Sequence, residues 1–257
     1  MRLYKIVLFT RHYEEEQRSN KVNTCYNNPS NFIIRYSVFN IRYSSPLLPY
    51  FYPMQPIKNI IFDLGGVFMN LDFSLTEKAF AELGVERFPE MFNQHHSNDL
   101  FEQLETGKIS PEAFYDAFRK EAGIDRSNEQ IKKAWNALLL DFPQERLNWL
   151  KAIAGKYRVY LYSNTNKIHY DAFMNVLQTE NNCTDFNNYF LKAYYSHELG
   201  LRKPYAASFE KILELENLVA AETLFIDDTF KNIQGAKEAG LQTHHLIAPE
   251  TVLDLGL

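Results

Sequence analysis

Three short apolar runs that each lead into a polar side chain constrain the fold of this chain most strongly. Asp63 follows NIIF, Ser163 follows VYLY, and the pair Asp227 and Asp228 follows TLFI. Each run has the length of a buried strand, and the two glycines that follow soon after Asp63 predict a tight turn. Similar runs near residues 190–195 and 243–247 raise the number of predicted strands to five.

Helical patterns separate these runs. Residues 206–215 repeat apolar side chains at helical spacing, and residues 233–239 lead into Gly240, a residue typical of helix C-termini. Strands that alternate with helices predict an α/β fold with a doubly wound, mainly parallel, Rossmann-like sheet. Ligands bind such sheets at the carboxyl ends of the strands, so we expect the polar residues that follow the runs to converge there.

Residues 72–142 lack strand signals. Helical segments such as LTEKAFAELG and SPEAFYDAFRKEAG follow one another, and Ser110 has the position of an N-cap. We therefore predict an inserted all-helical cap subdomain over residues 72–142. The core domain is predicted over residues 57–71 and 143–257.

Residues 1–53 differ in character, because they have no sustained helical or strand period and end in the proline-rich run SSPLLPYFYP. We interpret them as a poorly ordered extension, or as a mis-assigned start with Met54 as the true first residue. The alternative is a genuine arm particular to this protein.

Net charge and cysteine content limit the classes of binding partner and the cellular compartment that we expect for this protein. The net charge of −5 predicts neither a nucleic-acid partner nor an anionic membrane partner. No apolar stretch approaches the roughly 20 residues of a membrane span, and no signal peptide is evident. Cys25 and Cys183 show no metal or redox spacing, which favours a cytoplasmic protein. The oligomeric state is not encoded in any motif.

Four segments resemble, in order, the motifs of the haloacid dehalogenase superfamily of hydrolases: FDLGGV, YSN, RKP and FIDDTFKNIQGAKEAG, beginning at residues 62, 162, 202 and 225. The resemblance covers residues 57–247. It includes a cap inserted after the first motif, as in the branch with small helical (C1) caps, and is similar to members of the α-D-glucose-1-phosphate phosphatase type.

This resemblance implies a Mg²⁺-dependent phosphatase that hydrolyses a small phosphorylated metabolite, such as a sugar phosphate, through an aspartyl phosphate on Asp63. The implied catalytic residues are Asp63, Ser163 and Lys203. The implied metal ligands are Asp63, the Gly65 carbonyl, Asp227 and Asp228. Substrate contacts are expected from Gly66, Asn164 and Lys203. Asn232 stands where many relatives carry an acidic residue.

Gly65 departs from the usual pattern, in which an acid at this position protonates the leaving group. Asp72 could replace that acid, although a helix N-cap is the favoured interpretation of Asp72. Two alternatives stay open: a metal-free 2-haloacid dehalogenase, and a catalytically weakened binding or regulatory protein. The paired acids Asp227 and Asp228 argue against the dehalogenase, because they gather negative charge that only a cation makes tolerable.

Overall fold

A computed structural model describes residues 56–94, 96–183 and 185–257, and all structural statements below refer to them. The interpretation of residues 1–53 lies outside this range. Within it, no helix combines the length and the apolar content needed to cross a membrane.

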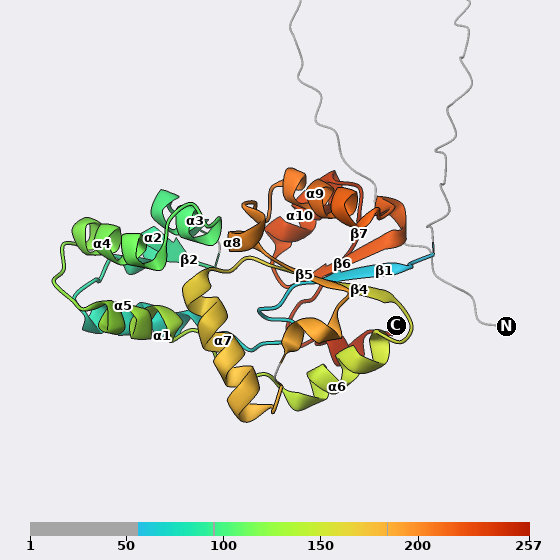
Figure 1. Cartoon of the computed structure of the whole chain (residues 1–257), viewed down its shortest axis with the longest axis horizontal. Helices are drawn as coiled ribbons and strands as arrows, with labels where there is room; N and C mark the ends of the chain where they lie inside the picture. Colours follow the sequence, from blue (N-terminus) through green and yellow to red (C-terminus); the bar gives the residue numbers. More distant parts are fainter. Residues whose placement is uncertain (1–55, 95, 184) are drawn as a thin grey trace, which may run out of the picture. The chain divides into compact units, whose positions relative to one another are not determined.

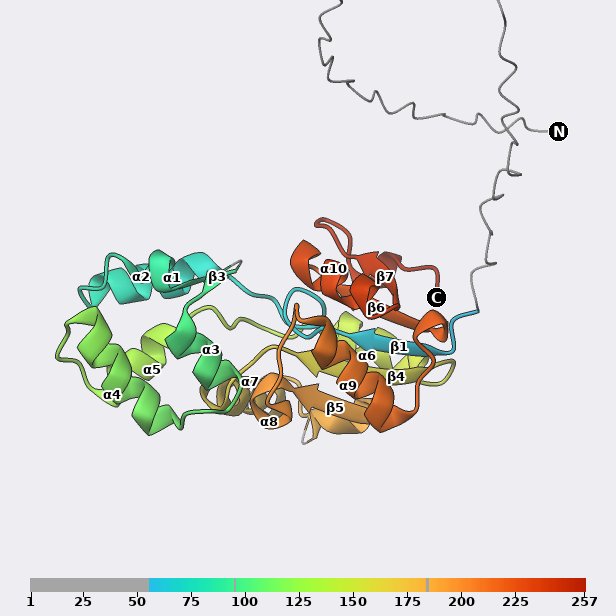
Figure 2. The same ribbon diagram turned by 90° about the horizontal axis from the view of Figure 1, so that it is seen from above.

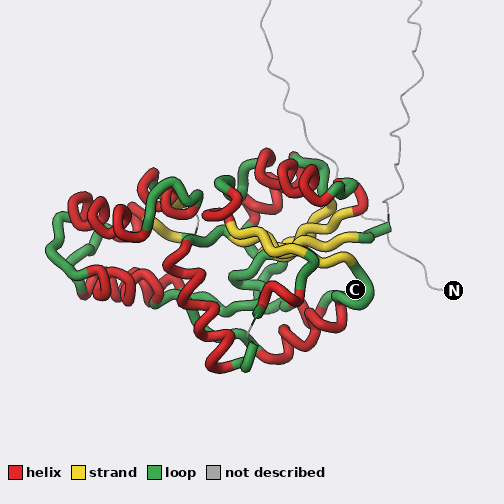
Figure 3. Tube along the Cα trace, in the orientation of Figure 1, coloured by secondary structure: helices red, strands yellow, loops and turns green. Residues whose placement is uncertain are grey.

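All five predicted strands form one parallel sheet (Figures 1 and 3). They are β1 (Asn59–Phe62), β4 (Arg158–Ser163), β5 (Lys192–Tyr195), β6 (Thr223–Asp227) and β7 (Gln242–His245). The order β5-β4-β1-β6-β7 puts β1 in the centre, with Phe62 paired to both Leu161 and Ile226. Asp63, one residue further on, therefore emerges at the middle of the carboxyl edge.

Helices cover both faces of the sheet, as the alternating side chains of its buried strands require (Figure 1). Ile60 and Phe62 pack against α6 (Gln144–Ile153) and α7 (Lys167–Glu180). Ile61 points to the other face, against α9 (Ala206–Glu216) and α10 (Phe230–Glu238). The predicted doubly wound α/β core is confirmed. The remaining core elements are α8 (Ser196–Leu199) and the 3₁₀ turns η1 (Phe186–Tyr189), η2 (Ala220–Glu222) and η3 (Val252–Asp254).

The insertion between the first two core strands is a helical bundle (Figure 2). It comprises α1 (Phe73–Glu82), α2 (Phe88–Met91), α3 (Asp99–Glu105), α4 (Pro111–Ala122) and α5 (Asn128–Asn136). Ser110 caps α4 by accepting a hydrogen bond from Ala113 N, as its position predicts. The expectation of an all-helical cap is wrong in one detail, because β2 (Phe92–Asn93) and β3 (His96–Ser97) form a short antiparallel pair. Two residues per strand are too few to show a period in the sequence.

A second hydrophobic core holds the cap together. Six large rings in it are fully buried: Phe80, Phe88, Phe101, Phe114, Phe118 and Trp135. The rings of Phe80 and Phe88 are stacked with centroids 4.2 Å apart. Ile168, from the start of core helix α7, belongs to the same cluster, so the cap core reaches into the main domain.

The two segments that join cap and core run side by side. Asn70 N donates to Asp141 O at 3.0 Å, and Leu140 N donates to Asn70 O at 3.1 Å. Asp72 N donates to Leu138 O at 2.9 Å. The segment that leaves the core and the segment that returns from the cap are thus paired antiparallel where they pass between core and cap.

Candidate active site

Three carboxylates meet at the carboxyl edge of the sheet. Asp63 follows β1, Asp227 ends β6, and Asp228 is the next residue. One oxygen from each lies within 4.8 Å of the others. The strand order brings these acids together although 164 positions separate Asp63 from Asp227.

Lys203 lies within this group with its side chain fully buried. Its Nζ is 2.8 Å from Asp63 Oδ1 and 2.7 Å from Asp227 Oδ2. The rings of Tyr162 and Phe225 lie 5.5 and 5.4 Å from the same nitrogen, at cation–π distance. Burial alone would lower the pKa of Lys203, but the two carboxylates outweigh burial and raise that pKa above its ordinary value. The lysine therefore remains a cation at neutral pH.

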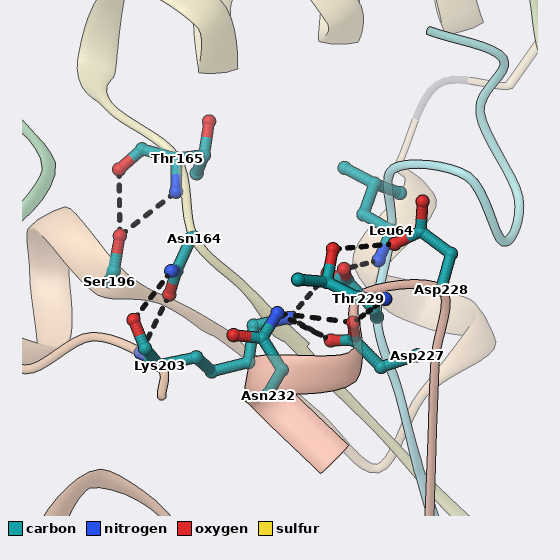
Figure 4. Close-up of polar contacts among 10 residues, drawn as sticks. Leu64, Asn164, Thr165, Ser196, Lys203, Asp227, Asp228, Thr229 and Asn232 are labelled. Atoms are coloured by element: carbon teal, nitrogen blue, oxygen red, sulfur yellow. Dashed lines mark hydrogen bonds and ion pairs between the residues drawn. The ribbon is translucent and has the colours of Figure 1, made fainter. Parts of the chain in front are cut away.

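Asp227 has hydrogen-bond partners for both of its oxygens (Figure 4). Oδ1 accepts from Thr229 N at 2.7 Å and from Asn232 Nδ2 at 3.1 Å. Oδ2 accepts from Asn232 Nδ2 at 3.0 Å and from Lys203 Nζ at 2.7 Å. This carboxylate is fully buried and fully engaged. The arrangement suits a residue that orients Lys203 better than it suits the metal ligand we expected.

Asp63 and Asp228 are less fully paired. Asp63 Oδ1 accepts from Leu64 N at 2.7 Å as well as from Lys203, which leaves Oδ2 for the cavity. Asp228 Oδ1 accepts from Thr229 Oγ1 at 3.2 Å, and the Asp228 carbonyl lies 2.9 Å from His245 Nε2. These two carboxylates are therefore the ones available to a ligand.

The raised pKa values of both carboxyls indicate that the site is short of positive charge. Burial raises the pKa of Asp63 well above its ordinary value, and Lys203 only partly opposes this. Burial, followed by the charge of Asp227, raises the pKa of Asp228 to about 6. A hard divalent cation with oxygen ligands would offset this crowding, so the residues present fit Mg²⁺.

The glycine turn after Asp63 leaves room for the Asp228 side chain to approach the backbone. Gly66 has φ of +71°, and a Cβ there would lie 2.4 Å from Asp228 Oδ2. Its N–H donates to Met69 O at 2.9 Å within the turn, and the expected substrate contact of Gly66 stays a prediction. Gly65 does line the cavity, and a Cβ there would meet only the tip of the Leu71 side chain, at 2.5 Å.

The side-chain amide of Asn164 is bonded to the loop that carries Lys203. Its Oδ1 accepts from Lys203 N and its Nδ2 donates to Lys203 O, both at 2.9 Å (Figure 4). The side-chain amide is used to fix the backbone of the lysine, and the expected substrate contact of Asn164 stays a prediction. Ser163, at the end of β4, lines the cavity next to these residues.

The acids open into a cavity of about 340 Å³ lined by both the core and the cap. Its lining includes Asp63, Ser163, Lys203 and Asp228 from the core, and Phe92, Asn93, Glu102 and Glu105 from the cap. Asp72 is absent from this lining. It caps α1 instead, with Oδ1 accepting from Ser74 N at 2.9 Å, in agreement with the favoured interpretation.

The sequence interpretation missed Thr229 and the charged cluster of Arg202 with Glu102 and Glu105. Thr229 follows the acid pair directly. Asp side chains often accept a hydrogen bond from the backbone N–H two residues further on, and this pattern could have identified Thr229 as a partner of Asp227. The ion-paired partners of Arg202 are about 100 positions away in the cap, and no local signal connects them.

Comparison with known proteins agrees with this geometry. The family model for haloacid dehalogenase-like hydrolases matches residues 57–240. D-ribitol-5-phosphate phosphatase from Bacteroides thetaiotaomicron is 32% identical over 188 residues, which cover 73% of this chain and 90% of that protein. The sesquiterpene phosphatase AstK from Aspergillus oryzae is 28% identical, with 74% and 89% covered. A crystal structure of a HAD family enzyme from B. thetaiotaomicron, in complex with magnesium and inorganic phosphate, superimposes with a TM-score of 0.70 at 37% identity, covering 76% of this chain and 96% of that one.

Proposed function

The chain belongs to the haloacid dehalogenase-like hydrolase family, and from that premise we propose that this magnesium-dependent phosphatase hydrolyses a small polyol phosphate, with Asp63 as its nucleophile. The observation that carries the proposal is the buried Lys203 between Asp63 and Asp227, beside the further carboxylate of Asp228 in the lining of the same cavity. The matched relative that acts on a pentitol phosphate supports the substrate class.

We assign the chemical steps to the chain's own residues. The Asp63 carboxylate attacks phosphorus and forms an aspartyl phosphate, while the ester P–O bond breaks and its electron pair leaves with the alcohol oxygen, which takes up a proton. Water then attacks phosphorus, which releases inorganic phosphate and restores the carboxylate. Lys203 holds Asp63 in position and offsets negative charge, and we assign to the Ser163 hydroxyl, in the cavity lining, the donation to a phosphoryl oxygen.

The metal site is proposed from Asp63, Asp228 and the Gly65 carbonyl, with Asp227 behind them. When bound, Mg²⁺ neutralises charge on the phosphoryl oxygens. The acid trio has no use in a metal-free dehalogenase, and retention of the lysine and all three acids argues against a decayed scaffold.

We further propose that residues 72–142 select the substrate while residues 57–71 and 143–257 carry the reaction. The cytoplasm is the proposed compartment, because phosphorylated metabolites are charged and do not cross bilayers unaided.

The test is phosphate release from a panel of phosphorylated pentitols, aldoses and hydroxy acids, with Mg²⁺ and with a chelator in its place. We expect ribitol 5-phosphate or another pentitol phosphate to have the highest kcat/KM and all turnover to stop without the metal. The substrate proposal is wrong if no polyol phosphate is hydrolysed while other esters are.

A further inference from the structure

A charged cluster connects the cap to the loop that carries Lys203. The Arg202 guanidinium reaches Glu102 Oε1 with Nη1 at 2.5 Å and Glu105 Oε2 with Nη2 at 3.0 Å. The two glutamates are three residues apart on α3, so they share one face of that helix. The residue after Arg202 is Lys203, which places the cluster beside the reaction site.

All three side chains line the same cavity as Asp63. Glu105 and Arg202 are largely buried, with 8% and 15% of their side chains exposed, whereas Glu102 is 35% exposed. Burial raises the pKa of Glu105, and the charges of Arg202 and Lys203 oppose that rise. The cluster is therefore built into the wall of the substrate cavity and is not an ion pair on the outer surface.

The position of the cluster is fixed by close packing of α3 against the core. A Cβ on Gly107, just after α3, would lie 2.1 Å from the carbonyl oxygen of His197 in α8. Only a glycine allows this approach. The glutamates on α3 are thus held at a set distance from the Lys203 loop.

The hydrogen bonding of the cluster is incomplete. Glu105 Oε2 and Arg202 Nε are buried without a hydrogen-bond partner among the described residues, although Glu105 Oε2 lies within ion-pair distance of Arg202 Nη2. Ser97 Oγ, on cap strand β3 and in the lining of the same cavity, also has none within the described part of the chain. A buried polar atom without a partner is destabilising, so a polar ligand in this cavity would gain by supplying the missing partners.

We propose that Glu102, Glu105 and Arg202 recognise hydroxyl groups on the leaving group of the substrate, an inference that rests on the proposed polyol phosphatase activity. A hydroxyl both donates and accepts, so it complements carboxylate acceptors and guanidinium donors together. Two carboxylates against one guanidinium give the cluster a net charge of −1, which disfavours leaving groups that carry a carboxylate. Glu102, Glu105 and Arg202 are thereby specificity determinants of the phosphatase.

The experiment compares kcat/KM for three substrates: ribitol 5-phosphate, 3-phosphoglycerate as a phosphorylated hydroxy acid, and p-nitrophenyl phosphate, whose leaving group has no aliphatic hydroxyls. The variants are Glu105→Gln and Glu102→Gln, which keep the side-chain shape and remove one charge. Glu77→Gln, at an exposed position on cap helix α1, is the matched control. Circular dichroism and thermal unfolding confirm that each protein is folded.

We expect the ratio of kcat/KM for ribitol 5-phosphate over p-nitrophenyl phosphate to fall by about tenfold or more in Glu105→Gln, and by less in the more exposed Glu102→Gln. The ratio for 3-phosphoglycerate over p-nitrophenyl phosphate should rise in both. Glu77→Gln should leave both ratios unchanged.

If kcat/KM falls equally for all three substrates, so that the ratios do not change, the inference is overturned. The cluster would then only connect the cap to the Lys203 loop. If the buried Glu105→Gln does not fold, the half-exposed Glu102→Gln decides the question by the same ratios. Failure of the proposed function is distinguishable, because wild-type enzyme would then hydrolyse p-nitrophenyl phosphate but not ribitol 5-phosphate.

Discussion

The carboxyl edge of the sheet and the cap that closes over it are organised differently. At the sheet edge, both oxygens of Asp227 and both ends of the Asn164 amide have hydrogen-bond partners. The cap is held by aromatic packing, and its cavity side carries polar atoms, such as Ser97 Oγ and Glu105 Oε2, that have no hydrogen-bond partner in the described part of the chain. We infer that the residues proposed to position the reaction groups are fixed by the protein's own hydrogen bonds, while the polar groups proposed to select a substrate are left for a ligand to complete.

The strongest test of this comparison is Asp63→Asn. The amide is a far weaker nucleophile than the carboxylate, so we expect kcat to fall by at least about 10³-fold. The side chains are nearly isosteric, so the thermal unfolding midpoint should change by only a few degrees. Residual activity within about tenfold of wild type would contradict the assignment of Asp63 as nucleophile.

Lys203→Met should have the next largest effect. It removes the cation between Asp63 and Asp227, and we expect kcat to fall by about 10²- to 10³-fold. Breaking a buried charge pair costs about 3–5 kcal/mol, so the metal-free protein should also unfold at a lower temperature. Lys211→Met, which removes an exposed lysine paired with Glu214, is the control and should change neither quantity appreciably. A Lys203→Met enzyme with near-normal kcat would show that the lysine is only structural.

The two glycines after Asp63 provide a finer comparison within the sheet edge. In Gly66→Ala the new methyl group meets Asp228 Oδ2 at a positive φ, so we expect Mg²⁺ affinity to weaken by about 10-fold or more. In Gly65→Ala the methyl group meets only the end of Leu71, a flexible side chain that is not a metal ligand, and affinity should change by less than about threefold. Isothermal titration with Mg²⁺ measures both, and equal effects would contradict the spatial argument.

The last expected effect, which needs no substitution, is the pH dependence of Mg²⁺ binding. Burial and the charge of Asp227 raise the pKa of Asp228 to about 6, so this carboxyl is protonated below that pH and ionised above it. Mg²⁺ binds the ionised form, and its affinity should therefore fall by about tenfold per pH unit below pH 6 and level off above it.

The same shift acts on stability without the metal. Because the pKa of Asp228 is raised on folding, its stabilising contribution is present below the ordinary value of 3.8 and is lost as the pH rises through about 6. Thermal unfolding from pH 5 to 8, with and without Mg²⁺, tests both statements. An increase in unfolding temperature on adding Mg²⁺ that is as large at pH 5 as at pH 7.5 would contradict them.

The sequence predicted the core well because its information is local. Each strand is a short apolar run, and each acid stands at the end of one, so the parallel sheet alone brings Asp63 and Asp227 together. The use of each polar atom was harder to predict. Asn164 could donate to a phosphate or to a backbone, and only the position of the Lys203 loop decides between them. The pairing of Arg202 with α3 depends on how the cap is set on the core, which no spacing in the sequence encodes.

The paired segments between cap and core have a consequence for how such an enzyme diversifies. Because the chain leaves and returns through neighbouring, hydrogen-bonded residues, the ends of the insertion are already together. Replacing everything between Leu71 and Leu139 by another bundle, or by a short turn, therefore requires no new closure of the main chain and adds little entropic cost. The acid cluster would keep its partners within the sheet through such an exchange. The same core domain can in this way be combined with different caps, and each exchange leaves the acid cluster of the sheet in place.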